Sequence, residues 1–99
     1  MMDKADIERE RISLMPVREL ITVTEVRSQW LSKSAELFLV RGYLDDTPLA
    51  SRHLRTLDPW KASICKAAIG GKSLAITWQR DPFSRMSWNE HNILQVEPK

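Results

Sequence analysis

One helix start signal stands out in this chain. Asp58 precedes Pro59 and Trp60. Aspartate is a favoured helix N-cap because its carboxylate accepts backbone hydrogen bonds, and proline suits the first helical position, where its missing N–H costs nothing. Gly70 and Gly71 follow, and glycine adopts the left-handed conformation that ends many helices. The sequence therefore predicts one short helix, and any fold for the chain has to accommodate it.

The spacing of apolar side chains predicts which face of this helix is buried. Apolar residues that recur at intervals of three and four positions share one side of a helix. Here they are Trp60, Ile64, Ala67, Ala68 and Ile69, whereas Lys61 and Lys66 lie off this stripe. We expect the stripe to face the core, with Cys65 as a small buried neighbour.

Three segments before the helix are rich in the β-branched and aromatic residues that favour strands. The first begins at Glu19, the second is Leu37–Leu44, and the third is Leu49–Leu57. A turn is predicted at Asp45–Pro48, because aspartate and proline favour turn conformations. Gly42, inside the second strand, indicates a kink or a close approach of two backbones.

Residues 23–33 have two interpretations. As a strand, the segment changes its apolar face after Val23, so a β-bulge is required near Thr24 or Glu25. As a helix, it would begin with a capping box formed by Thr22 and Glu25, followed by apolar residues at helical spacing. The density of β-branched residues favours the strand.

Two further strands are expected after the helix, at Lys72–Gln79 and Asn92–Val96, with a long loop over residues 80–91 between them. The order strand, strand, strand, helix, strand, strand predicts a mainly β or α+β fold, a small five-stranded barrel like the OB-fold. If residues 23–33 were helical, the order would instead suit a winged-helix-like α+β fold. Residues 1–16 are expected to form a charged arm or short helix, and residues 17–99 a single domain.

Composition excludes several classes of protein. The chain of 99 residues has 15 basic and 13 acidic residues, a near balance. It has no apolar run long enough to cross a bilayer, and its first residues are too charged for a signal peptide. A lone cysteine rules out an internal disulfide. We expect a cytoplasmic protein, a monomer or weak homodimer, that does not associate with membranes.

No constellation of reactive side chains indicates an enzyme. His53 and His91 lie far apart in the sequence and lack a metal-ligand spacing. The run from Gly70 to Ser73 resembles the end of a phosphate-binding loop, but the helix precedes it and position 66 is Lys where that motif needs Gly. We therefore expect no catalytic residue, no metal and no cofactor.

The most suggestive feature is the interleaving of aromatic and basic residues near the C-terminus. Residues 52–85 carry seven basic side chains against two acidic ones. Rings that stack on bases, alternating with cations that neutralise phosphates, are typical of proteins that bind single-stranded nucleic acid. The expected phosphate contacts are Arg41, Arg52, Arg55, Lys72, Arg80 and Arg85, and the expected stacking residues are Trp78, Phe83 and Trp88.

The sequence thus favours a non-enzymatic module that binds single-stranded DNA or RNA, with the loop over residues 80–91 as its main contact surface. The alternative is a protein-interaction or regulatory domain that uses the same surface, because Trp, Tyr and Arg also dominate protein interfaces.

Overall fold

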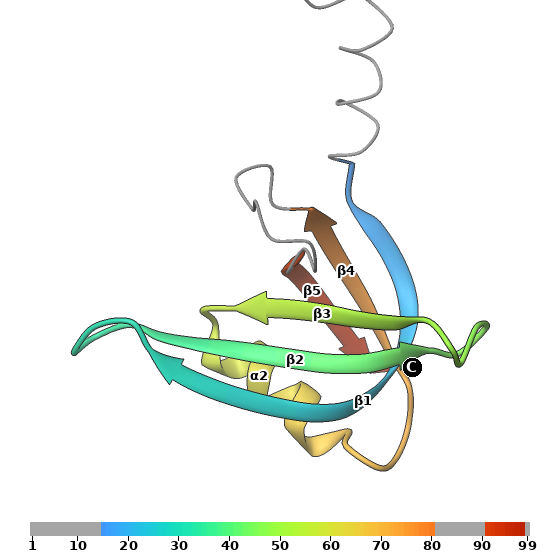
Figure 1. The fold of residues 1–99 in the computed structure, drawn as a ribbon, viewed down its shortest axis with the longest axis horizontal. Coiled ribbons are helices and arrows are strands. Elements are labelled where there is room, and N and C mark those ends of the chain that lie inside the picture. Colours follow the sequence, from blue (N-terminus) through green and yellow to red (C-terminus); the bar gives the residue numbers. More distant parts are fainter. Residues whose placement is uncertain (1–14, 81–90, 99) are drawn as a thin grey trace, which may run out of the picture.

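In the described part of the chain, five strands and one helix follow one another in the predicted order, and the strands close into a barrel (Figure 1). The computed structural model describes residues 15–80 and 91–98. The elements are β1 (Val17–Trp30), β2 (Glu36–Leu44), β3 (Ser51–Thr56), α2 (Pro59–Ala67), β4 (Leu74–Arg80) and β5 (His91–Pro98). The predicted mainly β fold, a small OB-like barrel of five strands, is confirmed. The predicted arm over residues 1–16 lies almost wholly outside the described residues.

The helical interpretation of residues 23–33 is wrong, and the winged-helix alternative fails with it. Residues 23–30 continue β1, which pairs with β2 in an antiparallel ladder as far as Trp30, and residues 31–33 lie in the bend that follows. The register shifts between Val23 and Glu25, which is the predicted bulge. Because of this shift, Val23 is buried and Val26 also packs against the core. Pairing with β2 outweighs the local capping-box pattern.

Gly42 lies where two backbones approach closely, as predicted. A Cβ atom at this position would be 2.6 Å from the carbonyl oxygen of Thr22 and 2.6 Å from Cγ2 of Ile21. Only glycine leaves room for this contact, so it allows β2 to curve tightly against β1.

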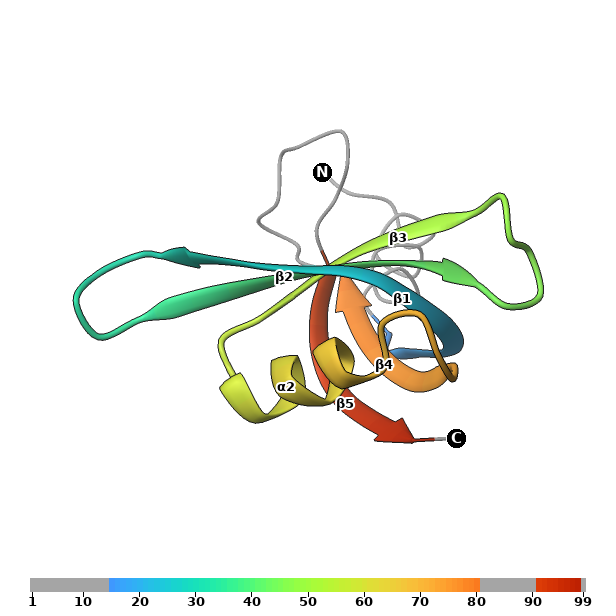
Figure 2. The ribbon, with the colours of Figure 1, turned by 90° about the horizontal axis from the view of Figure 1, so that it is seen from below.

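The barrel closes through β5, which lies between β3 and β4 (Figure 2). β4 pairs antiparallel with β1 and with β5. β3 and β5 are parallel, and among the described residues their ladder has two register pairs, Leu54 with His91 and Arg55 with Asn92. This short ladder, which we call the β3–β5 seam, completes the cylinder.

Side chains from all five strands and from α2 fill the barrel. The core cluster consists of Ile21, Val23, Val40, Leu54, Cys65, Leu74, Ile76 and Ile93. α2 packs mainly against β1 and carries buried Ala62 and Cys65. In the described part of the chain, no helix has the length and apolar character needed to span a membrane.

The predicted buried face of α2 is partly wrong. Ile64 and Ala68 do pack against the core, but Ala67 is exposed, Ile69 is 42% exposed and Trp60 is 74% exposed. The buried face is rotated towards small residues, because a short helix that lies close to the barrel has room for alanine and cysteine there but not for an indole ring.

Both ends of α2 are as predicted. The Asp58 carboxylate accepts a hydrogen bond from the backbone N–H of Trp60 at 2.9 Å, and Pro59 occupies the first turn. Gly70 has a φ of 74°, the left-handed conformation expected after the helix.

Candidate nucleic-acid interface

The outer surface of β2 and β3 is defined by the alternation of side chains along the two strands. Val40 and Gly42 of β2 and Leu54 and Thr56 of β3 are buried. The residues between them point outwards, because successive side chains of a strand lie on opposite faces. These outward residues are Leu39, Arg41 and Tyr43 on β2, and Ser51, His53 and Arg55 on β3.

The strand register places these residues in adjacent rows. Arg41 is opposite His53, and Leu39 is opposite Arg55. Arg55 also reaches across the β3–β5 seam, where its Nε donates to Oδ1 of Asn92 at 2.8 Å. Arg41 of β2 thus lies on the same surface as His53 and Arg55 of β3.

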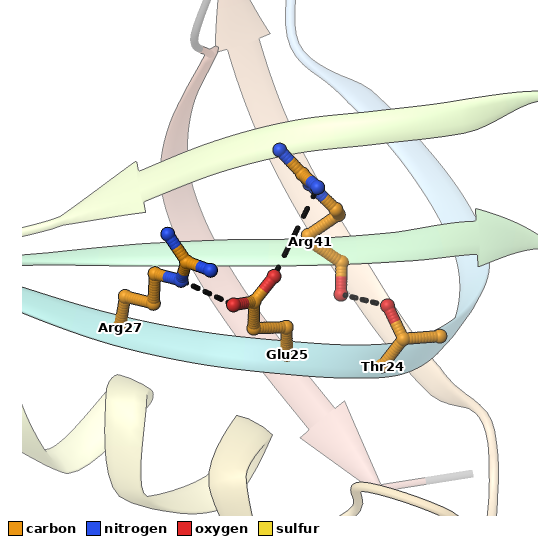
Figure 3. A network of polar contacts seen from close by, with 4 residues as sticks. All are labelled: Thr24, Glu25, Arg27 and Arg41. Atoms are coloured by element: carbon orange, nitrogen blue, oxygen red, sulfur yellow. Dashed lines mark hydrogen bonds and ion pairs between the residues drawn. The ribbon is translucent and has the colours of Figure 1, made fainter.

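β1 extends this surface with Glu25 and Arg27. Glu25 is the register partner of Arg41, and Arg27 is the partner of Leu39. Figure 3 shows the side chains of Glu25, Arg27 and Arg41 converging above the ribbon. Nε of Arg27 donates to Glu25, and a guanidinium nitrogen of Arg41 lies 3.9 Å from the other carboxylate oxygen. One carboxylate therefore holds two guanidinium groups side by side.

We call the surface formed by Arg27, Arg41, Tyr43, His53 and Arg55 the arginine face. A shallow depression in it is lined by Glu25, Leu39, Val40 and Leu54 together with three members of the face. Arg27 and Arg41 remain well exposed, with 75% and 57% of their side-chain surface accessible. A guanidinium has five N–H donors, so pairing with Glu25 leaves several of them directed at solvent.

A second polar group lies at the barrel end remote from α2, on inward-facing positions of β1, β3, β4 and β5. This barrel-end cluster consists of Glu19, Arg52, Trp78 and His91. Arg52 donates to both carboxylate oxygens of Glu19, at 2.8 and 3.1 Å. The indole N–H of Trp78 donates to the same carboxylate at 2.7 Å. The Trp78 ring stacks on the His91 ring with a centroid distance of 4.2 Å. The Arg52 guanidinium carbon lies 5.5 Å from the centroid of the Trp78 ring.

Electrostatics in the barrel-end cluster favours ionised Glu19 and neutral His91. Burial alone would raise the pKa of Glu19, but hydrogen bonds from Arg52 and Trp78 outweigh it and lower the pKa. Burial, together with the positive charges of Arg52 and Arg80, lowers the pKa of His91. His91 Nδ1 is buried and has no hydrogen-bond partner in residues 15–80 and 91–98.

The nine predicted contact residues are thus distributed over several places. Arg41 and Arg55 share the arginine face. Arg52 and Trp78 belong to the barrel-end cluster, where each already has partners. Arg80 is exposed at the end of β4, and Lys72 is exposed between α2 and β4. Most of the predicted contact loop, with Phe83, Arg85 and Trp88, lies outside the described residues.

Arg27, Tyr43 and His53 belong to the arginine face but were not among the contact residues predicted from the sequence. The signal that could have identified them was the alternation along the strands combined with the hairpin register. The predicted contact residues were chosen because aromatic and basic residues alternate along the sequence. In the barrel, the residues that lie close together are instead those paired across neighbouring strands.

Within the described residues, no group of three or more His, Cys, Asp and Glu side chains could hold a metal ion. Comparisons with models of protein families, with curated proteins and with solved structures give no match for this chain, so its function has to be inferred from the geometry of its surfaces.

Proposed function

We propose that this protein binds single-stranded nucleic acid, DNA or RNA, along the arginine face. The observation that carries the proposal is the grouping of Arg27, Arg41 and Arg55 with the rings of Tyr43 and His53 on one outer surface of the barrel. Cations of this kind neutralise phosphates, and rings stack on bases at about 1 to 3 kcal/mol per base. The outer face of the second and third strands is also a common oligonucleotide surface in OB-fold barrels.

Glu25 has a positioning role in this proposal. Its contacts with Arg27 and Arg41 fix two guanidinium groups before a ligand arrives, which lowers the entropy cost of binding. The donors that Glu25 does not use are available for phosphate oxygens, which arginine binds in a bidentate geometry.

The barrel-end cluster supports the binding surface in this proposal and does not contact the ligand. Arg52 donates two hydrogen bonds to Glu19, and Trp78 is covered by His91 on at least one face. A phosphate or a base would have to displace these partners. We therefore assign affinity to Arg41, Arg55 and Tyr43 rather than to Arg52 and Trp78.

The test is fluorescence polarisation with labelled oligothymidylate and oligouridylate at several salt concentrations. We expect Arg41→Ala and Arg55→Ala each to reduce the slope of log affinity against log salt by about one unit. Tyr43→Ala should weaken binding by about 1 to 3 kcal/mol without changing that slope, because stacking releases no counterions.

Arg18→Ala is the matched control. Arg18 is an exposed β1 arginine that lies 3.5 Å from Glu97, away from the arginine face. Its removal should leave binding nearly unchanged. The proposal fails if neither oligonucleotide binds at low salt, or if Arg18→Ala weakens binding as much as Arg41→Ala.

A further inference from the structure

One edge of β1 has no strand beside it in the described part of the chain. β1 pairs with β4 from Val17 to Ile21 and with β2 from Ile21 to Trp30. From Glu25 onwards the strand is therefore hydrogen-bonded on the β2 side alone. An unpaired strand edge presents a row of backbone N–H and C=O groups that can pair with an extended chain.

A groove runs between this edge and α2. Its apolar lining comes from Val26 of β1, Phe38 of β2, and Pro59 and Ala62 of α2. Val26 and Phe38 lie on the inward face of the β1–β2 hairpin, where it extends beyond the closed part of the barrel (Figure 2). The groove thus combines a free strand edge with an apolar floor, the two features that bind an extended peptide.

The charge of the groove lining indicates the charge of the partner. The remaining lining residues are Ser28 and Ser63, which are uncharged, and Arg27 and Lys66, which are basic. The lining contains no acidic residue. Lys66 is exposed on the last turn of α2, so its ammonium group is accessible to an anionic side chain.

Large exposed aromatic residues occur next to the groove. Trp60, which follows Pro59 of the lining, is 74% exposed, and Trp30, at the end of the free edge, is 64% exposed. Exposed tryptophans are costly to leave in water and are enriched where protein partners bind.

We propose that this groove binds an extended, acidic segment of a protein partner, which adds as a strand to the Val26–Trp30 edge of β1. The partner's apolar side chains pack against Phe38 and Ala62, and its carboxylates pair with Lys66. A second copy of this chain fits less well, because pairing through the same edge would bring two basic grooves together. The groove borders the arginine face at Arg27, but its apolar floor lies on the opposite, inward face of the β1–β2 hairpin, and the proposal does not depend on nucleic-acid binding.

The test uses synthetic peptides in which valine or leucine alternates with glutamate, added to the isotopically labelled full chain and followed by NMR. We expect saturable shifts of the Val26–Trp30 amides and of the Trp60 indole signal. Counterparts with lysine in place of glutamate should bind at least tenfold more weakly. Peptides N-methylated at alternate backbone amides should also lose at least tenfold, because they lack the donors for strand pairing.

Lys66→Glu and Lys72→Glu form a matched pair of variants, since both lysines are exposed but only Lys66 lines the groove. Lys66→Glu should weaken binding of the acidic peptides at least tenfold, and Lys72→Glu less than twofold. Circular dichroism checks that both variants keep the fold.

Five results would overturn the proposal, and the first four concern the peptides, the variants and the oligomeric state. They are the absence of saturable shifts, equal binding of the N-methylated peptides, equal effects of the two variants, and a dimer that forms through this edge without peptide. Shifts caused at the groove by an oligonucleotide in place of the acidic peptide would assign the surface to nucleic acid and equally contradict it. Lys66→Glu tests the groove alone, whereas Arg41→Ala and Tyr43→Ala test the arginine face alone, so failure at one site leaves the other unaffected.

Discussion

Glu19 links three strands of the barrel through one carboxylate. It accepts hydrogen bonds from Arg52 of β3 and from Trp78 of β4. Half-buried ion pairs with bidentate geometry are among the pairs that do contribute to stability, because their desolvation cost is offset by several hydrogen bonds. Glu19 therefore connects β1, β3 and β4 at the end of the barrel where the barrel-end cluster lies.

Glu19 should make the fold sensitive to acid. Its folded-state pKa lies below its ordinary value of 4.5, so its contribution to stability is complete above that pH and is lost as the pH falls through the lowered pKa. Urea unfolding between pH 3 and pH 7 should show Glu19→Gln less stable than the native protein at neutral pH, with the gap narrowing in acid. Glu97→Gln, in an exposed pair, is the control and should change little.

Gly42 should tolerate no larger residue. The Cβ of alanine would lie 2.6 Å from two atoms of β1, one of them a backbone oxygen that cannot move freely. We expect Gly42→Ala to destabilise the fold by about 1 to 3 kcal/mol, the usual cost of overpacking, measured by urea unfolding. Gly71→Ala is the control, because its nearest contact would be 3.7 Å away. Equal stability of the two variants would contradict the close approach.

At the scale of elements, α2 depends on its N-cap. Asp58 accepts from the Trp60 N–H and also pairs with Lys61 at 3.1 Å. These contacts, with the side-chain hydrogen bond from Lys61 as the largest, lower the pKa of Asp58. The cap therefore holds the helix that carries Ala62 and Cys65 into the core.

Asp58→Ala should lower the thermal midpoint of unfolding, because the first turn of α2 loses its cap. Asp58→Asn keeps an acceptor at the same place and should retain most of the stability. Oligonucleotide affinity should be the same in both variants, since the helix lies off the arginine face. Equal melting of the alanine and asparagine variants would show that the side chain does not cap the helix.

Most elements could be predicted from the sequence because their local signals agreed with the fold, although the capping-box pattern at Thr22 and Glu25 did not. The cap at Asp58 and the strand pattern of β2 each depend on neighbours in the chain, and so does the bulge after Val23. The buried face of α2 could not be predicted, because it depends on how closely the helix approaches the barrel. Arg27 and His53 were missed for a similar reason, since their proximity to Arg41 arises only from pairing across the ladder.

For the molecule as a whole, the β3–β5 seam is the shortest ladder of the cylinder within residues 15–80 and 91–98. It has two register pairs, whereas the β1–β2 ladder runs from Ile21 to Trp30. Few backbone hydrogen bonds mean a low free energy of local opening. The side-chain bond between Arg55 and Asn92 is therefore an important additional connection across it.

Native-state hydrogen exchange should show this difference directly. We expect amides at the β3–β5 seam to exchange faster than those of the central β1–β2 ladder. Asn92→Ala should accelerate exchange at the seam further, whereas Gln95→Ala, which removes a bond confined to β5, should not. Uniform exchange around the barrel would mean that the cylinder opens only as a unit.

Because Cys65 is buried between α2 and the barrel, its chemical reactivity reports on opening of this part of the structure. The side chain is fully shielded, and burial raises the pKa of the thiol to about 11, so almost none of it is thiolate at neutral pH. In alkylation the thiolate is the nucleophile that attacks the reagent, so the sulfur has to be both deprotonated and accessible. Since the chain has one cysteine, the rate of its labelling measures how often α2 lifts from the barrel, with no need for an introduced probe.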